Sequence, residues 1–349
     1  MTDRLPIYLD HAATAPILPE VRAVVSEAMA RWANPSSVHA AGRAARAALE
    51  DARGRVAAAL GWSGAVIFTG SATEALAMGW AAGKGCVRLA SAVEHTAVLR
   101  HAGDAIVPVD ADGLVDPDRL PRADLLAVQH ANNETGVIQP LDRIAQAVRA
   151  GGGLLLADCA QTATKQALPD ADLIAIAGHK LGAPPGIGAL LVRDLALLVP
   201  AGGQERGYRP GTENLPYILG LATALEADRG WLAGAADLRA WFEGELCAMG
   251  LEVIGAAAPR VPTLGAYRLP GTAATTLLIR SDMARIAISA GSACASGSIS
   301  PSHVMRAMGM DEAAAREVFR VSIGRDTTRA DLEALLAVVQ GVMASGARR

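Results

Sequence analysis

The chain has 349 residues, a net charge of −3 and an apolar fraction of 51%, enough for a large core and for more than one domain. Its 32 basic and 35 acidic residues form no block of like charge, so we do not expect nucleic acid as the main ligand. No apolar run has signal-peptide or membrane-spanning length, which predicts a soluble cytoplasmic protein without membrane contact. Four widely spread cysteines without a CxxC spacing indicate reduced thiols, and we expect no metal site.

Short apolar runs alternate with helical patterns through most of the chain. Residues 5–16 suggest a short strand and a turn. Helices are expected from residue 19 to the break at Asn34-Pro35, over 40–60, from residue 94 and over 215–226. Seven later runs predict strands, at residues 66–69, 87–90, 106–109, 125–130, 154–157, 172–177 and 187–192. Such repetition predicts right-handed crossovers and a mostly parallel sheet.

Two of these runs end in residues that an active site can use. The run at 154–157 stops at Asp158, with Gln161 three residues on, and the run at 172–177 stops at Gly178-His179-Lys180. Ligands of open α/β sheets lie beyond the carboxyl ends of the strands. A desolvated lysine there can form a Schiff base, and an aspartate can hold a pyridine nitrogen protonated. Alternatively, Asp158 caps a turn and Lys180 is a solvated loop lysine.

The turn at residues 70–74, GSATE, joins a predicted strand to a predicted helix. Backbone N–H groups at such a helix start can bind a phosphate, and the hydroxyl of Ser71 or Thr73 can assist. Ser71 with Glu74 equally fits an S-x-x-E capping box. His95 lies at another strand-to-helix junction, where a histidine is often only a helix-start or core residue.

Three later features complete the candidate site. The polar, glycine-dense segment 202–214 looks like a functional loop, and a composition shift near 228–237 marks a domain boundary. Cys294 lies among Gly, Ser and Ala, a setting in which a thiolate can be accessible. Arg320 follows in a strand-like run, either as a carboxylate-binding fork or as a surface arginine.

Ten ordered motifs resemble those of the pyridoxal-phosphate-dependent cysteine desulfurases, a group of the class V aminotransferases. They span nearly the whole chain, and the segment GSACASGS resembles the corresponding segment of the subgroup that has a long catalytic loop. The motifs are YLDHAATAP, NPSSVHAAGR, FTGSATEALAMG, EHTAVLR, NNETGVIQP, ADCAQTATK, AGHKLGAPPGIGALLVR, GGQERGYRPGTEN, SAGSACASGSISPSHVMRAMG and RVSIGRDTT.

The resemblance implies the α/β architecture of fold type I of the pyridoxal-phosphate-dependent transferases. Residues 15–232 would form a large cofactor-binding domain around a mostly parallel seven-stranded sheet flanked by helices. Residues 1–14 and 233–349 would form a smaller α+β domain that carries the catalytic cysteine loop. The resemblance also implies a homodimer.

The resemblance further implies a role for each candidate residue. Lys180 would carry pyridoxal phosphate as a Schiff base, and His95 would stack on its ring and move protons. Cys294 would accept the sulfur. Asp158 would pair with the ring nitrogen, and Gln161 would donate to the ring oxygen. The phosphate would be bound by Ala72, Thr73, His179 and Thr212 of a second subunit. Asn133 would contact the cofactor and the substrate, and Arg320 would bind the substrate carboxylate.

The implied activity converts L-cysteine to L-alanine and a persulfide on Cys294, for transfer to a sulfur-acceptor protein such as an iron–sulfur scaffold. The alternatives are a selenocysteine lyase or cysteine desulfhydrase and, from another class, a non-catalytic sulfur-assembly scaffold. The sequence departs from the family at Ala177, where a phosphate-binding serine is usual. It also lacks the usual basic residue in Pro184-Pro185-Gly186 and is shorter than many relatives in the small domain.

Overall fold

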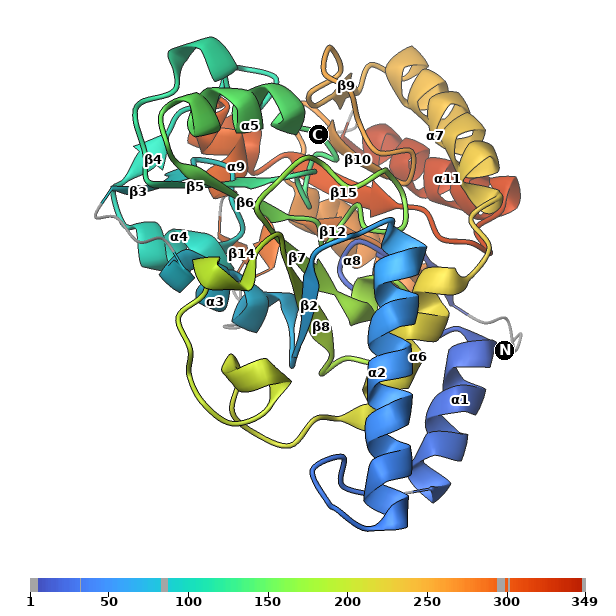
Figure 1. The fold of residues 1–349 in the computed structure, drawn as a ribbon. Coiled ribbons are helices and arrows are strands. Elements are labelled where there is room, and N and C mark those ends of the chain that lie inside the picture. Colours follow the sequence, from blue (N-terminus) through green and yellow to red (C-terminus); the bar gives the residue numbers. More distant parts are fainter. Residues whose placement is uncertain (1–5, 32, 83–86, 294–298, 301, 347–349) are drawn as a thin grey trace.

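The computed structural model describes residues 6–31, 33–82, 87–293, 299–300 and 302–346. Its largest sheet has seven strands in the order β2-β8-β7-β6-β5-β3-β4, and only β8 runs antiparallel to its neighbours. The fold is therefore α/β with a mostly parallel sheet, as predicted (Figure 1). The strands are β2 (Ala65–Thr69), β3 (Arg88–Ser91), β4 (Ile106–Val107), β5 (Leu125–Gln129), β6 (Leu154–Asp158), β7 (Leu173–Ala177) and β8 (Gly188–Val192).

Both faces of this sheet are covered by helices, because successive side chains along each strand point to opposite faces. Leu155 and Ala157 of β6 belong to one core cluster, whereas Leu156 between them belongs to another. The first cluster includes side chains of α1 (Pro19–Ala30), α2 (Ala40–Leu60), α5 (Leu141–Ala150) and α6 (Leu215–Glu226), and the second includes those of α3 (Ala72–Ala82) and α4 (Thr96–Ala102).

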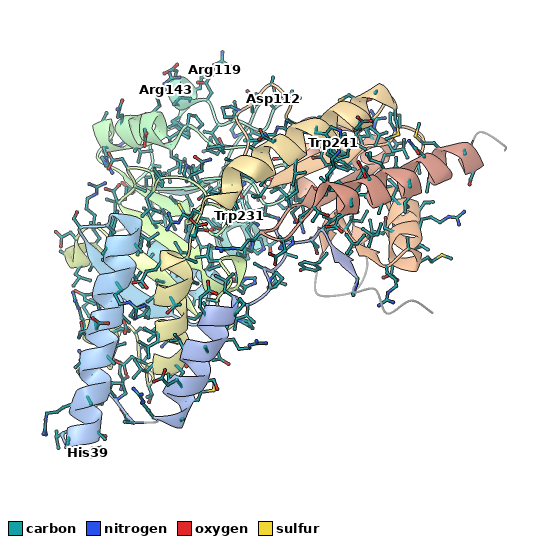
Figure 2. The ribbon with its side chains drawn as sticks, turned by 90° about the vertical axis from the view of Figure 1, so that its right-hand side faces the viewer. His39, Asp112, Arg119, Arg143, Trp231 and Trp241 are labelled. Carbon is teal, nitrogen blue, oxygen red and sulfur yellow. The ribbon has the colours of Figure 1, made fainter. Side chains whose placement is uncertain are left out.

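A second unit packs beside the large sheet. Its sheet has the order β12-β15-β10-β9, and its core cluster includes Leu9, Phe242 and Phe319. Figure 2 shows α7, which carries the labelled Trp241, lying beside α11 in this unit. The guanidinium of Arg329 at the start of α11 lies over the Trp241 ring, 4.2 Å from its centroid. The elements are β9 (Glu252–Val253), β10 (Leu264–Arg268), β12 (Ser289–Ala290), β15 (Val318–Ser322), α7 (Trp231–Ala248), α8 (Ala274–Met283) and α11 (Arg329–Gly346).

The N-terminal segment belongs to this second unit in space. Strand β1 (Ile7–Tyr8) pairs in parallel with β11 (Ile286–Ala287), and Leu9 lies in the same core as Phe319. Two more strands, β13 (Ser292–Ala293) and β14 (Ile299–Ser300), and the short helices α9 (His303–Ala307) and α10 (Glu312–Ala315) complete the chain. The domain limits at residues 15 and 232 stay a prediction. Within the described residues, no helix combines the length and apolar character needed to cross a bilayer.

Candidate active site

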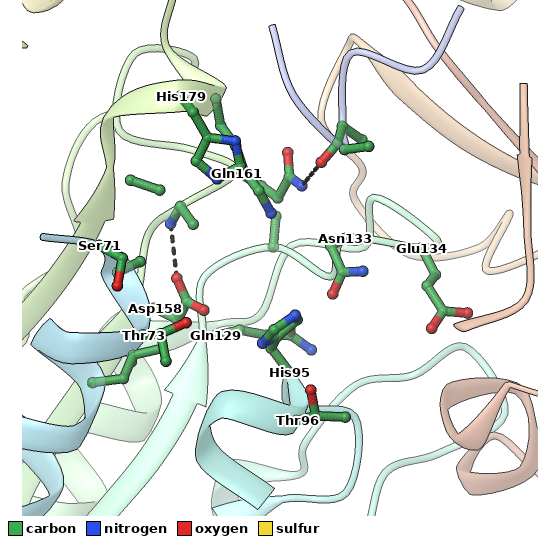
Figure 3. Close-up of a pocket in the computed structure, with 18 of the residues that line it drawn as sticks. Ser71, Thr73, His95, Thr96, Gln129, Asn133, Glu134, Asp158, Gln161 and His179 are labelled. Carbon is green, nitrogen blue, oxygen red and sulfur yellow. Dashed lines mark hydrogen bonds between the residues drawn. The ribbon is translucent and has the colours of Figure 1, made fainter. Parts of the chain in front are cut away.

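A pocket of about 320 Å³ opens at the carboxyl ends of the parallel strands. Residues at or just after the ends of β6 and β7, the start of α3 and the second unit line this pocket (Figure 3). Nine of the eleven predicted site residues line this pocket. They are Ala72, Thr73, His95, Asn133, Asp158, Gln161, His179, Lys180 and Arg320.

Lys180 and Asp158 lie on neighbouring strand ends and interact electrostatically. Burial lowers the pKa of the Lys180 amine, and this outweighs the opposite effect of Asp158. Asp158 is buried, and its Oδ1 accepts the N–H of Ala160 at 2.9 Å, so the turn-capping role is present. Its other carboxylate oxygen accepts no hydrogen bond from the part of the chain that is described. Lys180 is half-buried and lines the pocket, which argues against the solvated loop lysine of the alternative interpretation.

The start of α3 carries part of the predicted helix cap and lies at the pocket. Ser71 Oγ accepts the N–H of Glu74 at 3.1 Å, which is one half of the predicted capping box; the Glu74 carboxylate accepts the N–H of Gly70 at 2.6 Å and not that of Ser71. The N–H groups of Ala72 and Thr73 have no acceptor inside the helix and lie at the pocket, where the helix dipole favours an anion.

Gly188 at the start of β8 allows this helix start to approach the sheet. A Cβ at this position would stand 2.7 Å from the carbonyl carbon of Ser71 and 2.7 Å from the carbonyl oxygen of Ile176. Both contacts are with backbone, so a side chain here would displace the turn that forms the pocket wall. The role of Gly188 was not predicted from the sequence.

His95 begins α4 and is also a pocket residue. Its Nδ1 accepts the N–H of Ala97 at 3.1 Å, so the neutral ring carries its proton on Nε2. Burial lowers the pKa of His95, which keeps the ring neutral near pH 7. Both interpretations of His95, as a helix-start residue and as a site residue, therefore fit its position.

Glu94 and His303 are site residues that sequence reasoning missed. Glu94 is buried behind the pocket residue Gln129, whose N–H its Oε1 accepts at 2.5 Å, and burial followed by the charge of Asp158 raises its pKa well above the usual value. His303 lines the pocket and donates from Nε2 to the backbone oxygen of Glu94 at 2.9 Å. In the segment EHTAVLR only His95 was predicted as a site residue, and no local sequence pattern predicts a role for His303.

The N-terminal segment forms the wall that faces β6. Gln161 Nε2 donates to the backbone oxygen of Ala12 at 2.9 Å, and its Oε1 is buried without a partner among the residues described (Figure 3). Arg320 is mostly buried and pairs with Asp10, at 2.7 Å between Nη2 and Oδ1. The surface-arginine interpretation of Arg320 is therefore wrong.

Two predicted residues are not seen in this pocket. Thr212 is exposed and lines a different cavity with Arg209 and Glu213, so within one chain it does not reach Lys180. Cys294 lies outside the described residues, as does Cys86. Of the remaining thiols, Cys159 is buried, which raises its pKa and makes it unreactive, and Cys247 is exposed.

Known proteins resemble this chain along nearly its whole length. The family model described as aminotransferase class-V matches residues 7–335. A cysteine desulfurase of Gluconacetobacter diazotrophicus is 36% identical, with 97% of this chain and 93% of the relative aligned. The protein of Dictyoglomus turgidum named cysteine desulfurase IscS is 33% identical, with 97% and 94% aligned.

Among solved structures, a NifS-like protein from Rickettsia africae matches with a TM-score of 0.88 at 27% identity, covering 97% of this chain and 99% of that one. Another, described as SspA in complex with cysteine, matches with a TM-score of 0.78 at 28% identity, covering 92% and 100%. The chain therefore belongs to the class-V aminotransferase family and, within it, to the cysteine desulfurases.

Proposed function

We propose that this protein removes sulfur from L-cysteine with pyridoxal phosphate, leaving L-alanine and a persulfide on Cys294. The observation that carries the proposal is the pocket in which Lys180, Asp158, His95 and Arg320 converge. A lysine nucleophile, a buried carboxylate, a neutral imidazole and a guanidinium are the side chains that amino-acid chemistry on this cofactor requires.

The residues of the pocket fit pyridoxal phosphate. The amine of Lys180, with its lowered pKa, is available to bind an aldehyde, and the free oxygen of Asp158 can accept a hydrogen bond from a protonated ring nitrogen. Gln161 has one N–H left beyond its bond to Ala12, and the N–H groups of Ala72 and Thr73 suit a phosphate. When bound, the cofactor supplies an electron-withdrawing ring that stabilises negative charge on the substrate α-carbon.

Different side chains then bind the substrate, move the α-proton and accept the sulfur. Arg320 binds the substrate carboxylate, and Asn133 lies beside it. Lys180, once free, and the ring of His95 can hold and move the α-proton, because both line the pocket and burial lowers the pKa of each. The Cys294 thiolate attacks the substrate sulfur, an S–S bond forms as the C–S bond breaks, and the carbon fragment takes up a proton to leave as L-alanine.

The test is incubation of the holoenzyme with L-cysteine and a reductant, with sulfide and alanine measured together. Equal yields support desulfuration, whereas pyruvate and ammonia would indicate a desulfhydrase and contradict the proposal. With ³⁵S-cysteine and no reductant, label should remain on the wild-type protein and not on Cys294→Ala. Label retained equally by both proteins would remove Cys294 from the reaction.

We also propose a homodimer in the cytoplasm that passes sulfur to an acceptor protein such as an iron–sulfur scaffold. The support for a dimer is the position of Thr212, which is exposed and lies outside the Lys180 pocket of the same chain. It is near the end of segment 202–214, in which Glu205 is held by Arg53. Light scattering at twice the mass of one chain is the expected result. If Thr212 serves a partner's phosphate site, Thr212→Ala should lower cofactor affinity without changing the dimer.

A further inference from the structure

The guanidinium of Arg320 is held by two acceptors that belong to the protein itself. Nη2 donates to Asp10 Oδ1 at 2.7 Å, and Nη1 donates to the backbone oxygen of Asn133 at 2.8 Å. The third nitrogen, Nε, is buried and has no hydrogen-bond partner among the described residues. Arg320 thus has a fixed orientation before any ligand arrives.

The position of Asp10 is fixed by backbone pairing and not by its attraction to Arg320. The N–H of Ser322 donates to the oxygen of Leu9 at 2.9 Å, and the N–H of Ala12 donates to Ser322 Oγ at 2.9 Å. Asp10 and Ser322 face each other in a parallel bridge. Ser322 follows Arg320 by two residues in β15, so both side chains lie on the same side of the strand. The geometry therefore makes Asp10 the fixed partner and the long side chain of Arg320 the group that is positioned.

The remaining donors of Arg320 suit one more carboxylate. A guanidinium has five N–H donors in a rigid plane, and two of them are used by Asp10 and Asn133. A carboxylate binds best to two parallel donors on one edge. The buried Nε–H is costly while it has no acceptor, and a ligand carboxylate on the edge that contains Nε removes this cost.

We propose that Asp10 is a positioning residue for substrate binding, which orients Arg320 so that its Nε edge meets the α-carboxylate of the amino acid. This inference rests on the proposed function, since it takes an α-amino acid as the ligand. Asp10 touches neither the sulfur nor the α-carbon in this scheme. Its loss therefore weakens binding of the amino acid and leaves the chemical steps largely intact.

The experiment compares Asp10→Asn with wild-type holoenzyme in two assays. In turnover, the KM for L-cysteine should rise about tenfold, as expected for losing one charge-assisted contact, while kcat changes less than about threefold. In calorimetry, the Kd for L-alanine, which has no sulfur to lose, should rise by a similar factor. Asp10→Glu, which keeps the charge, should recover part of both. The control is Asp104→Asn, an exposed aspartate that lines neither this pocket nor the cavity on the other side of Lys180, for which neither constant should change.

A KM and a Kd within twofold of wild type in Asp10→Asn would overturn the inference. So would an equal loss in kcat and cofactor content, because that pattern indicates a general structural role. If Asp10→Asn does not fold, Ser322→Ala serves in its place: it removes the acceptor for Ala12 N–H, and should raise both constants about threefold. The L-alanine measurement does not depend on desulfuration, so a wild-type enzyme that releases no sulfide refutes the proposed function without deciding this inference.

Discussion

The segment 202–214 is anchored to the large domain by a buried ion pair, and replacing Glu205 with Gln should destabilise the fold. The Glu205 carboxylate accepts from Arg53 Nη1 at 2.7 Å, from Arg53 Nη2 at 3.1 Å and from the backbone N–H of Phe68 at 2.8 Å. The side chain of Glu205 is fully buried and that of Arg53 is 6% exposed. Breaking such a pair leaves a buried charge unpaired, which costs about 3–5 kcal/mol.

The expected cost lies near the lower end of that range, about 3 kcal/mol, because Arg53 keeps a contact with Glu50 at 3.1 Å. Urea unfolding followed by circular dichroism measures it. The matched control is Glu252→Gln, which breaks the more exposed pair with Arg268 and should cost less than about 1 kcal/mol. A loss below about 1 kcal/mol in Glu205→Gln would refute the reasoning. Such a result would mean that pairing with Glu205 is not what compensates the burial of the Arg53 charge.

Three further predictions concern the pocket and its support. Gly188→Ala should cost about 1–3 kcal/mol of stability and lower cofactor affinity, measured by equilibrium dialysis, whereas Gly244→Ala, with open space around its Cβ in α7, should do neither. Ala177→Ser should add one neutral hydrogen bond to a bound phosphate, worth about 1 kcal/mol, and tighten cofactor binding about fivefold; equal affinities in the same dialysis would contradict this. Burial lowers the pKa of His130 to about 4 from 6.5, so its contribution to stability is complete above pH 6.5 and is lost as the pH falls toward 4. The free energy of unfolding should therefore fall by roughly 2–3 kcal/mol more in wild type than in His130→Asn between pH 7 and 4.5, and parallel pH profiles would count against this cause.

Most of the sheet and the main helices could be predicted from local pattern. Runs of apolar residues bounded by turn formers correspond to all seven strands, and helices α2 and α6 span the predicted residues 40–60 and 215–226. The direction of β8 was not predicted, because a strand buried on both faces has the same apolar pattern whichever way it runs. The short connection from β7 to β8 is the signal that was available, since a parallel crossover needs a dozen or more residues.

The site was predicted where it follows the strand ends and missed where it depends on distant pairing. Asp158, His179 and Lys180 come directly after or at the ends of adjacent strands, so topology alone brings them together. Asp10 is 310 residues from Arg320 in sequence, and no local pattern reports that β15 brings the two together. The motif comparison named Arg320 without naming the carboxylate that holds it.

The balance of charge in the pocket explains why its lysine can act as a nucleophile. Asp158 by itself would favour the protonated amine of Lys180, but burial acts more strongly in the opposite direction, and Arg320 adds to it. Near this pair, burial followed by the charge of Asp158 raises the pKa of Glu94 well above its usual value. Asp10 also favours the protonated amine, so burial and Arg320 together lower the pKa of Lys180 against the effect of two carboxylates.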